Sequence, residues 1–133
     1  MALIDMGADI NIKSNNGQSP LVHALLGKKE SIAKILIHRR ADVNAKDGHG
    51  KTPLMTAIRV AAMLSSNRAK IVRIVERLVQ EGADINAKDE SGETPLSIAQ
   101  DEELQEVVNL LLAKGATVGT KHQTLMARLA RKS

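Results

Sequence analysis

The chain of 133 residues contains no phenylalanine, tyrosine, tryptophan or cysteine. Without aromatic rings, its core must be built from Leu, Ile, Val, Ala and Met, and the bases of single-stranded nucleic acid have no side chain on which to stack. Without cysteine, neither a disulfide nor a thiolate metal site can form. No apolar run approaches the roughly 18 residues of a membrane-spanning helix. These absences indicate an aliphatic globular domain and disfavour nucleic-acid binding and membrane insertion.

Catalytic and metal-binding patterns are also missing. The sequence has no Gly-x-Ser-x-Gly turn, and its four histidines lack the paired spacing that a zinc site needs. The stretch 48–52, GHGKT, is too short for a phosphate-binding loop, and residues 84–89 lack the ligand order of a calcium loop. His23 is expected to be partly buried, and His49 to be a surface contact residue. We therefore predict that the chain is not an enzyme and binds neither a metal nor a cofactor.

Two short motifs recur along the chain in a common register. A Gly-x-Ser/Thr-Pro-Leu motif begins at Gly17, Gly50 and Gly92, at intervals of 33 and 42 residues. An Ala-Asp/Thr motif begins at positions 8, 41, 83 and 116, at intervals of 33, 42 and 33 residues. The two motifs agree on a 33-residue unit, one copy of which carries nine additional residues.

Each unit is predicted to contain two helices and a turn. A Ser or Thr before each of the three prolines provides a hydroxyl N-cap with proline at the first helical position. Short inner helices are expected at about 20–27, 53–64 and 95–101, and longer outer helices at about 30–39, 69–80 and 103–113. Glycine follows the outer helices where a left-handed residue is needed, except that Arg40 takes its place once. The C-cap at Arg40 is therefore expected to differ or to carry strain.

The segments GKTPLMTAI, GETPLSIAQ and GADINAKD resemble ankyrin repeats, over residues 1 to about 119. The resemblance implies an all-α solenoid of stacked helix-turn-helix units with extended β-turn fingers. One departure is that the histidine usual after Thr-Pro-Leu is Val22, Met55 or Ser97 here, which removes a hydrogen-bond network that the family uses between neighbouring loops.

The whole chain, 1–133, is interpreted as a single ankyrin-repeat domain. Its predicted parts are a partial repeat at 1–15, repeats at 16–48, 49–90 and 91–120, and a C-terminal capping helix at 121–133. The truncated first repeat leaves the apolar residues Leu3, Ile4, Met6 and Ile10 facing an absent neighbour. Either the chain is a fragment of a longer array or another surface covers that face.

The resemblance implies a non-catalytic protein–protein interaction module whose partner docks on the concave surface of finger tips and inner helices. On the fingers the matching residues are Asn15, Asn16, Gln18, Gly48, His49, Lys51, Glu90, Ser91 and Glu93. On the inner helices they are Val22, Met55, Arg59 and Ser97, which are expected to be exposed. These positions differ from copy to copy while the framework stays constant, so the fold does not name the partner.

The nine additional residues fall at about 61–69, in the turn between the inner and outer helices of one repeat. They are either a tolerated loop insertion, which costs little free energy, or a second contact surface. In the second case the contacts would be Val60, Met63, Leu64 and Arg68, with the apolar side chains projecting beyond the neighbouring repeats.

Charge is strongly segregated along the chain. Residues 28–81 carry 12 basic and 5 acidic side chains, whereas residues 82–113 carry 1 basic and 8 acidic ones. The basic group Arg59, Arg68, Lys70, Arg73 and Arg77 is either a solvated helix face or a site for an acidic protein segment. The acidic group at 101–106 either complements a helix dipole or meets a basic partner. Because the positive charge is interrupted, nucleic acid is disfavoured as a partner.

Two alternatives to a free binding module remain open. The chain could be an assembly element that self-associates through its N-terminal face, or the binding arm of a larger effector or enzyme. The resemblance implies a cytoplasmic, intracellular location, and delivery into a host cell as an effector also stays open.

Overall fold

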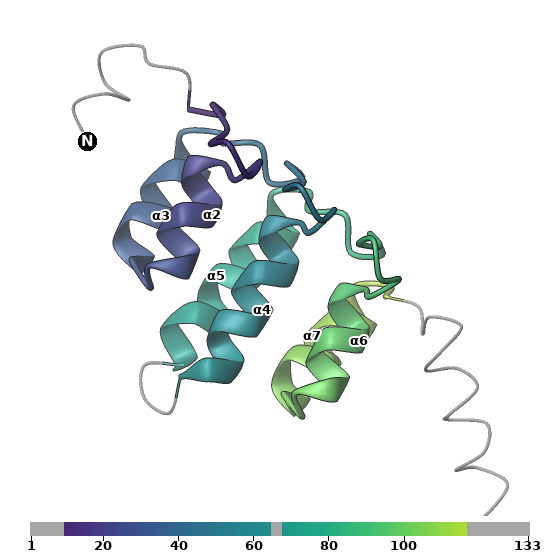
Figure 1. Ribbon diagram of the computed structural model, residues 1–133. Helices are drawn as coiled ribbons and strands as arrows, with labels where there is room; N and C mark the ends of the chain where they lie inside the picture. Colours follow the sequence, from purple (N-terminus) through teal and green to yellow (C-terminus); the bar gives the residue numbers. More distant parts are fainter. Residues whose placement is uncertain (1–9, 65–67, 117–133) are drawn as a thin grey trace, which may run out of the picture.

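A computed structural model describes residues 10–64 and 68–116, and these residues form helices without any strand. The helices are labelled in Figure 1 as α2 (Pro20–Leu26), α3 (Glu30–His38), α4 (Pro53–Met63), α5 (Arg68–Gln80), α6 (Pro95–Asp101) and α7 (Gln105–Ala113). Their bounds lie within a few residues of those predicted. The predicted capping helix at 121–133 and the apolar residues Leu3, Ile4 and Met6 lie outside the described residues.

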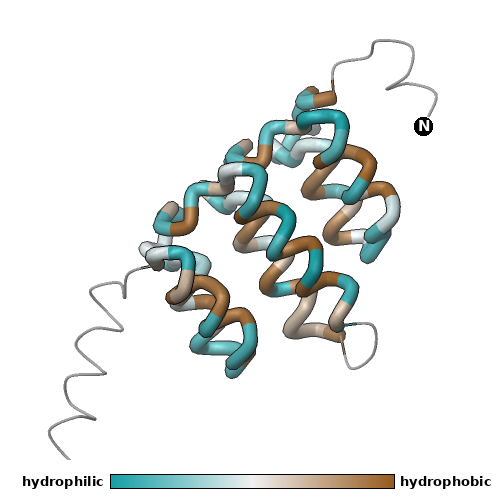
Figure 2. The backbone as a smooth tube through the Cα atoms, turned by 180° about the vertical axis from the view of Figure 1, so that it is seen from behind, coloured by the Kyte–Doolittle hydropathy of each residue, from teal (hydrophilic) through white to brown (hydrophobic). Residues whose placement is uncertain are grey.

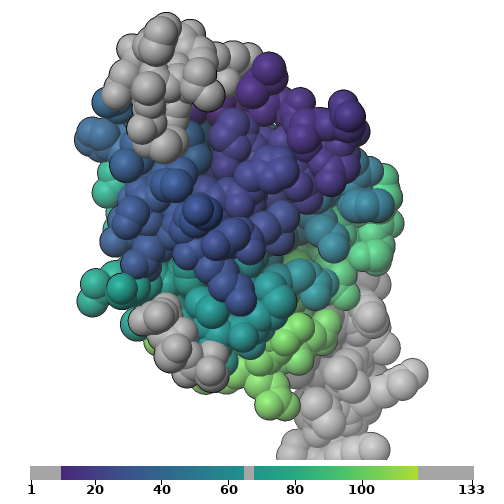
Figure 3. Space-filling model, turned by 60° about the vertical axis from the view of Figure 1, so that its left-hand side comes forward, coloured from purple at the N-terminus to yellow at the C-terminus, as the bar shows by residue number. Residues whose placement is uncertain are grey.

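The helices are arranged in pairs that stack side by side (Figure 1). The inner helix α4 packs between α2 and α6, and the outer helix α5 packs between α3 and α7. Figure 3 views this stack from the end formed by α2 and α3, whose purple and blue residues lie in front of the teal second repeat. The predicted all-α stack of helix pairs is therefore confirmed, and each repeat buries its faces against its neighbours.

The core follows the helical periodicity of the aliphatic residues. Hydrophobic and hydrophilic residues alternate along each helix in Figure 2. Leu54 on α4 and Leu78 on α5 are fully buried, and so are Leu21 and Leu96, the counterparts of Leu54 on the neighbouring inner helices. Burying one such side chain contributes about 1.5–3 kcal/mol, so an aliphatic core of this kind holds the stack together without aromatic residues.

Each inner helix begins at the hydroxyl cap that the sequence predicts. The side chains of Ser19, Thr52 and Thr94 accept hydrogen bonds from backbone N–H groups three residues later, at 3.1–3.4 Å. Proline occupies the first turn of each of these helices. Because the caps are identical in kind, the three inner helices start at equivalent points and remain in register across the stack.

The outer helices end at a left-handed residue. Gly82 and Gly115 have φ angles of 96° and 97°, and Arg40 has a φ angle of 67° at the equivalent position of the first described repeat. An L-residue in this conformation stores about 1–2 kcal/mol of backbone strain. Of the two expectations for this C-cap, a different conformation or strain, the positive φ of Arg40 is contrary to the first and consistent with the second.

The additional residues of the middle repeat lengthen both of its helices. The inner helix α4 has 11 residues and the outer helix α5 has 13, against 7 in α2 and α6 and 9 in α3 and α7. Each helix of this repeat thus gains about one turn at the end opposite the fingers. The Nε of Arg68 donates a hydrogen bond to the carbonyl of Ala61 at 3.0 Å and so ties the two lengthened ends together.

The fingers contact one another through their main chains. The N–H of Gly48 donates to the carbonyl of Asn16 at 3.2 Å, and the N–H of Glu90 donates to the carbonyl of His49 at 3.0 Å. Gly17, in the first of these fingers, has a φ angle of 81°, and a Cβ atom there would lie 2.7 Å from the backbone nitrogen of Gly48. The first finger therefore requires glycine both for its turn and for the close approach of the next finger.

A matched pair of substitutions separates these two requirements. Gly92 has a φ angle of 84°, but a Cβ atom added to it would meet no other atom within 4 Å. We expect Gly92→Ala to lower the free energy of unfolding by about 1 kcal/mol, which is the cost of positive φ alone. Gly17→Ala should cost about 1–3 kcal/mol more, because the methyl group also pushes the fingers apart. Urea denaturation followed by circular dichroism measures both values, and equal losses would contradict the proposed finger contact.

Candidate functional site

A groove of about 440 Å³, here called the inner groove, runs between the fingers and the inner helices. It is lined by Gln18, Val22, Leu26, Asp47, His49, Lys51, Thr56, Arg59, Val60, Met63 and Glu102. These residues come from three successive repeats, with the finger at 47–51 and helix α4 supplying most of them. The groove is therefore a composite surface that forms only when the repeats stack.

One end of the inner groove is apolar. Met63 lies in the turn by which α4 exceeds its neighbours and is 62% exposed, and Leu26 at the end of α2 is 45% exposed. Val60 lies one turn before Met63 and is fully buried below them. Exposed large apolar side chains that line a common groove are typical of a surface that contacts another molecule.

The other end of the inner groove is polar, and Asp47 fixes the conformation of the finger turn there. A carboxylate oxygen of Asp47 accepts hydrogen bonds from the backbone N–H groups of His49 at 2.8 Å and Lys51 at 3.0 Å. The imidazole of His49 lies 3.8 Å from the carboxylate of Glu90 on the next finger. The turn therefore presents His49 and Lys51 in a defined arrangement at the finger tip, as expected of an Asx-type turn.

Arg59 lies between the apolar and polar ends. Its Nε is buried and has no hydrogen-bond partner among the described residues. A guanidinium donor shielded from water without an acceptor is unfavourable, because hydrogen bonds to charged groups contribute about 1.5–3 kcal/mol each. This Nε is shielded from any bound molecule, so the binding chemistry follows from the charge of Arg59 on the groove lining, which favours a ligand that carries a carboxylate or carbonyl oxygen.

The expected exposure of three inner-helix residues is wrong. Val22, Met55 and Ser97 are 2%, 0% and 4% exposed. They occupy the third position of their helices, which turns toward the packed interior instead of toward the groove. The hydroxyl of Ser97 is used within the chain instead of for binding. It accepts a hydrogen bond from the N–H of Thr94 and donates one to the carboxylate of Glu93, both at 2.8 Å. Of the three, only Val22 reaches the inner groove, as part of its floor.

Two further expectations about side-chain position are wrong. Val60 does not project beyond the neighbouring repeats, because the lengthened helix α4 turns it into the core, where it is 0% exposed. His23, expected to be partly buried, is exposed, because it lies on the opposite side of α2 from the buried residues Leu21 and Leu25. By contrast, Met63 is exposed as expected, and Leu64 is half-buried.

The predicted finger residues divide into two groups. Gln18, His49 and Lys51 line the inner groove together with Arg59. Some of the others are engaged within the chain, since Ser91 donates to Asp89 and Glu93 accepts from Ser97. The finger residues that do not line the inner groove are Asn15, Asn16, Gly48, Glu90, Ser91 and Glu93, and the insertion residues Leu64 and Arg68 do not line it either.

Sequence reasoning missed three lining residues, which are Leu26, Asp47 and Thr56. A helical signal for two of them is present in the sequence. Leu26 follows Val22 by four residues, and Thr56, Val60 and Met63 have helical spacing on α4, so each set lies on one side of its helix. The role of Asp47 is also visible in the sequence, because an Asp two residues before a finger tip is a recurrent turn residue. Glu102 belongs to the acidic group at 101–106 that the sequence offers as a contact for a basic partner, but its place in the inner groove, which it enters from the next repeat, was not predicted.

The finger of the third repeat depends on a buried carboxylate, Asp89. Burial by itself raises the pKa of Asp89, but hydrogen bonds from the hydroxyl of Ser91 and from the N–H groups of Glu93 and Ser91, together with the nearby charge of Lys51, hold this pKa below its ordinary value. The three hydrogen bonds to Asp89 measure 2.8–2.9 Å. The ionised form is therefore the one that stabilises the finger.

The replacement Asp89→Asn tests this dependence. We expect it to lower the free energy of unfolding by about 1–2 kcal/mol at pH 7, because the charge-assisted hydrogen bonds are lost. The pKa of Asp89 is lower in the folded chain, so its contribution is present above the ordinary pKa of about 3.9 and is lost as pH falls through the folded value.

The difference between wild type and Asp89→Asn should therefore shrink below about pH 4 in urea titrations. Glu76→Gln is the control, because the side chain of Glu76 is exposed and has no hydrogen bond or ion pair with another described residue. A difference between wild type and Asp89→Asn that stays constant from pH 7 to pH 3 would contradict the role of the ionised carboxylate.

Residues 10–64 and 68–116 contain neither a membrane-spanning helix nor a metal-binding cluster. None of the helices in these ranges is both long and apolar enough to cross a bilayer. The same ranges contain no cluster of three or more His, Cys, Asp or Glu side chains that could hold a metal ion.

Comparison with known proteins identifies one family. The family model described as ankyrin repeats (3 copies) matches residues 1–73 and 60–122. A search of curated proteins finds no match.

Proposed function

This chain belongs to the ankyrin repeat family, and we propose that it binds a protein partner in the inner groove. Ankyrin repeats generally mediate protein–protein interaction, and the family is typically non-catalytic. The proposal is that the finger tip at 47–51 and the exposed side of α4 together form the contact surface. Ankyrin repeat proteins are generally intracellular, and we propose the cytoplasm as the place where the partner is met.

The observation that carries the proposal is the combination of two features in one groove. At one end, Leu26 and Met63 expose apolar surface. At the middle, Arg59 places a positive charge on the groove lining. Since interface hot spots are enriched in arginine and lie in desolvated pockets, Arg59 is the residue expected to contribute most to binding.

This combination also defines the chemistry of the partner. A fitting segment carries an apolar side chain that packs between Leu26 and Met63, and a carboxylate or carbonyl oxygen that accepts from Arg59. Asp47 and Glu102 add negative charge at the rim of the inner groove, so a partner with an acidic residue at those points is disfavoured. The partner segment is therefore amphipathic, with its acceptor confined to the part that faces Arg59.

The double variant Arg59→Gln/Met63→Ser tests the proposal. It removes one cation and one exposed apolar side chain from the inner groove. A matched control, Lys88→Gln/Leu112→Ser, removes the same two kinds of group elsewhere, because Lys88 is exposed and Leu112 is 47% exposed on α7. Both variants are first checked for an unchanged thermal unfolding midpoint.

The measurement is affinity capture from a native lysate, followed by titration calorimetry with the main captured protein. We expect the groove variant to bind at least about tenfold more weakly, whereas the control keeps its affinity within about twofold. Equal affinities for the two variants would show that the partner docks elsewhere.

A further inference from the structure

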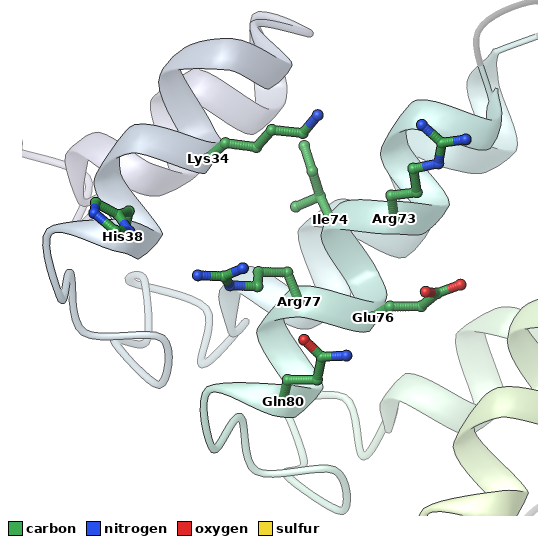
Figure 4. Close-up of a pocket in the computed structure, with 7 residues that line it drawn as sticks. All are labelled: Lys34, His38, Arg73, Ile74, Glu76, Arg77 and Gln80. Atoms are coloured by element: carbon green, nitrogen blue, oxygen red, sulfur yellow. The ribbon is translucent and has the colours of Figure 1, made fainter.

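A second groove lies between the outer helices α3 and α5, in the layer of outer helices, whereas the inner groove lies on the layer of inner helices. This outer groove has a volume of about 390 Å³ and is drawn in Figure 4. It is lined by Lys34, His38, Arg73, Ile74, Glu76, Arg77 and Gln80. None of these residues lines the inner groove, so the two surfaces are separate.

The charges along the outer groove change after its first helical turn. At the start of the two helices, Glu30 of α3 and Lys70 of α5 form an ion pair at 3.2 Å. One turn further along α3 the residue is Lys34, and the next turn brings His38. On α5 the corresponding turns carry arginines, at positions 73 and 77. An acid faces a base in the first turn, whereas basic groups face one another in the following two.

Of the positive groups in these later turns, only Arg77 is paired within the described residues, through an exposed ion pair on its own helix. The side chains of Lys34 and Arg73 have no hydrogen bond or ion pair with another described residue. The Nε of Arg77 lies 3.3 Å from Glu81 on its own helix, and its guanidinium points toward His38 in Figure 4. The carboxylate among the lining residues, Glu76, points away from α3 in the same view.

Comparison with the next repeat shows that the fold does not require this charge. By the repeat interval of 42 residues, Lys34 corresponds to Glu76, and by the interval of 33, Arg73 corresponds to Glu106. The α5–α7 pair therefore carries acids at two of the positions where the α3–α5 pair carries bases. Because the same framework tolerates either sign, the positive charge is a property of the outer groove alone.

We propose that the outer groove binds an acidic protein segment that places two carboxylates opposite Lys34 and Arg77. These carboxylates take the role that Glu30 fills for Lys70 in the first turn. Lys34 and Arg77 lie on the two helices that border the groove, so the two carboxylates bridge α3 and α5. Glutamates four residues apart on a helix lie on one face and can both point toward the groove. The buried Ile74 provides an apolar floor beneath this contact.

Nucleic acid fits this surface less well than an acidic segment. A phosphate backbone needs a continuous positive path, and here the adjacent helices α5 and α7 carry Glu76 and Glu106. A short acidic helix covers only the positive turns and avoids the acidic ones. The proposal is independent of the partner in the inner groove, and either surface can be tested without the other.

The probe is a fluorescein-labelled, alanine-rich helical peptide of about 15 residues with two glutamates four residues apart. Fluorescence anisotropy gives its affinity for the full chain, and amide chemical shifts locate it. We expect the largest shifts at residues 34–38 and 73–77. A peptide with glutamine at the same two positions should bind more weakly, because it carries no carboxylate that can pair with Lys34 and Arg77. A peptide with the glutamates two residues apart should also bind more weakly, because its two carboxylates point to different sides of the helix.

Two charge variants identify the binding surface. Lys34→Gln/Arg77→Gln should weaken peptide binding by about five- to tenfold, as expected for the loss of two exposed ion pairs. The control Lys88→Gln/Lys114→Gln removes the same net charge from exposed positions elsewhere and should change affinity by less than about twofold. The inner-groove variant Arg59→Gln/Met63→Ser should bind the acidic peptide as well as wild type does.

Three results would overturn the proposal. The first is an equal loss of affinity in the two charge variants, which would indicate diffuse attraction. The second is unchanged binding by Lys34→Gln/Arg77→Gln. The third is tighter binding of a DNA duplex than of the peptide at the same residues, because the outer groove would then be a nucleic-acid surface.

Discussion

The main-chain hydrogen bonds between successive fingers are the constraint on which the remaining structure depends. Gly48 of the second finger donates to the first finger, and Glu90 of the third finger donates to the second, so the three described fingers form a continuous series. Side chains reinforce the series, since Asn44 accepts from the N–H of Asp84 at 2.6 Å and Asn11 accepts from the N–H of Asp42 at 2.7 Å. Because no repeat can bury its core alone, these contacts fix the spacing at which the helices meet.

Both grooves follow from that spacing. The inner groove combines residues of three repeats, and the outer groove combines the outer helices of two. The middle repeat contributes most to each of them, through the finger at 47–51, the lengthened helix α4 and the basic side of α5. Its additional turn places Met63 at the apolar end of the inner groove, so the feature that distinguishes this repeat is also a feature of the proposed contact surface. The residues that all repeats share thus maintain the framework, and the residues that only the middle repeat carries determine the chemistry of its surface.

The sequence predicted the helices well because their boundaries are determined locally. A Ser or Thr before proline starts each inner helix, and the left-handed residue that ends each outer helix is recognisable even where arginine replaces glycine. The direction of individual side chains was predicted less well. Met55 and Val60 are buried because the neighbouring inner helices cover them, and Glu102 joins the inner groove from another repeat. Such contacts depend on packing between repeats, which the motif of a single repeat does not contain.

The central claim, that the inner groove is where a protein partner binds, is tested most directly by photocrosslinking. The photoreactive amino acid p-benzoylphenylalanine is introduced as Met63→p-benzoylphenylalanine in the inner groove and, for comparison, as Leu112→p-benzoylphenylalanine on α7, since both side chains are exposed. After irradiation in a native lysate, position 63 is expected to yield a discrete crosslinked protein that is absent at position 112. A partner that crosslinks only from position 112, or equally from both, would contradict the account.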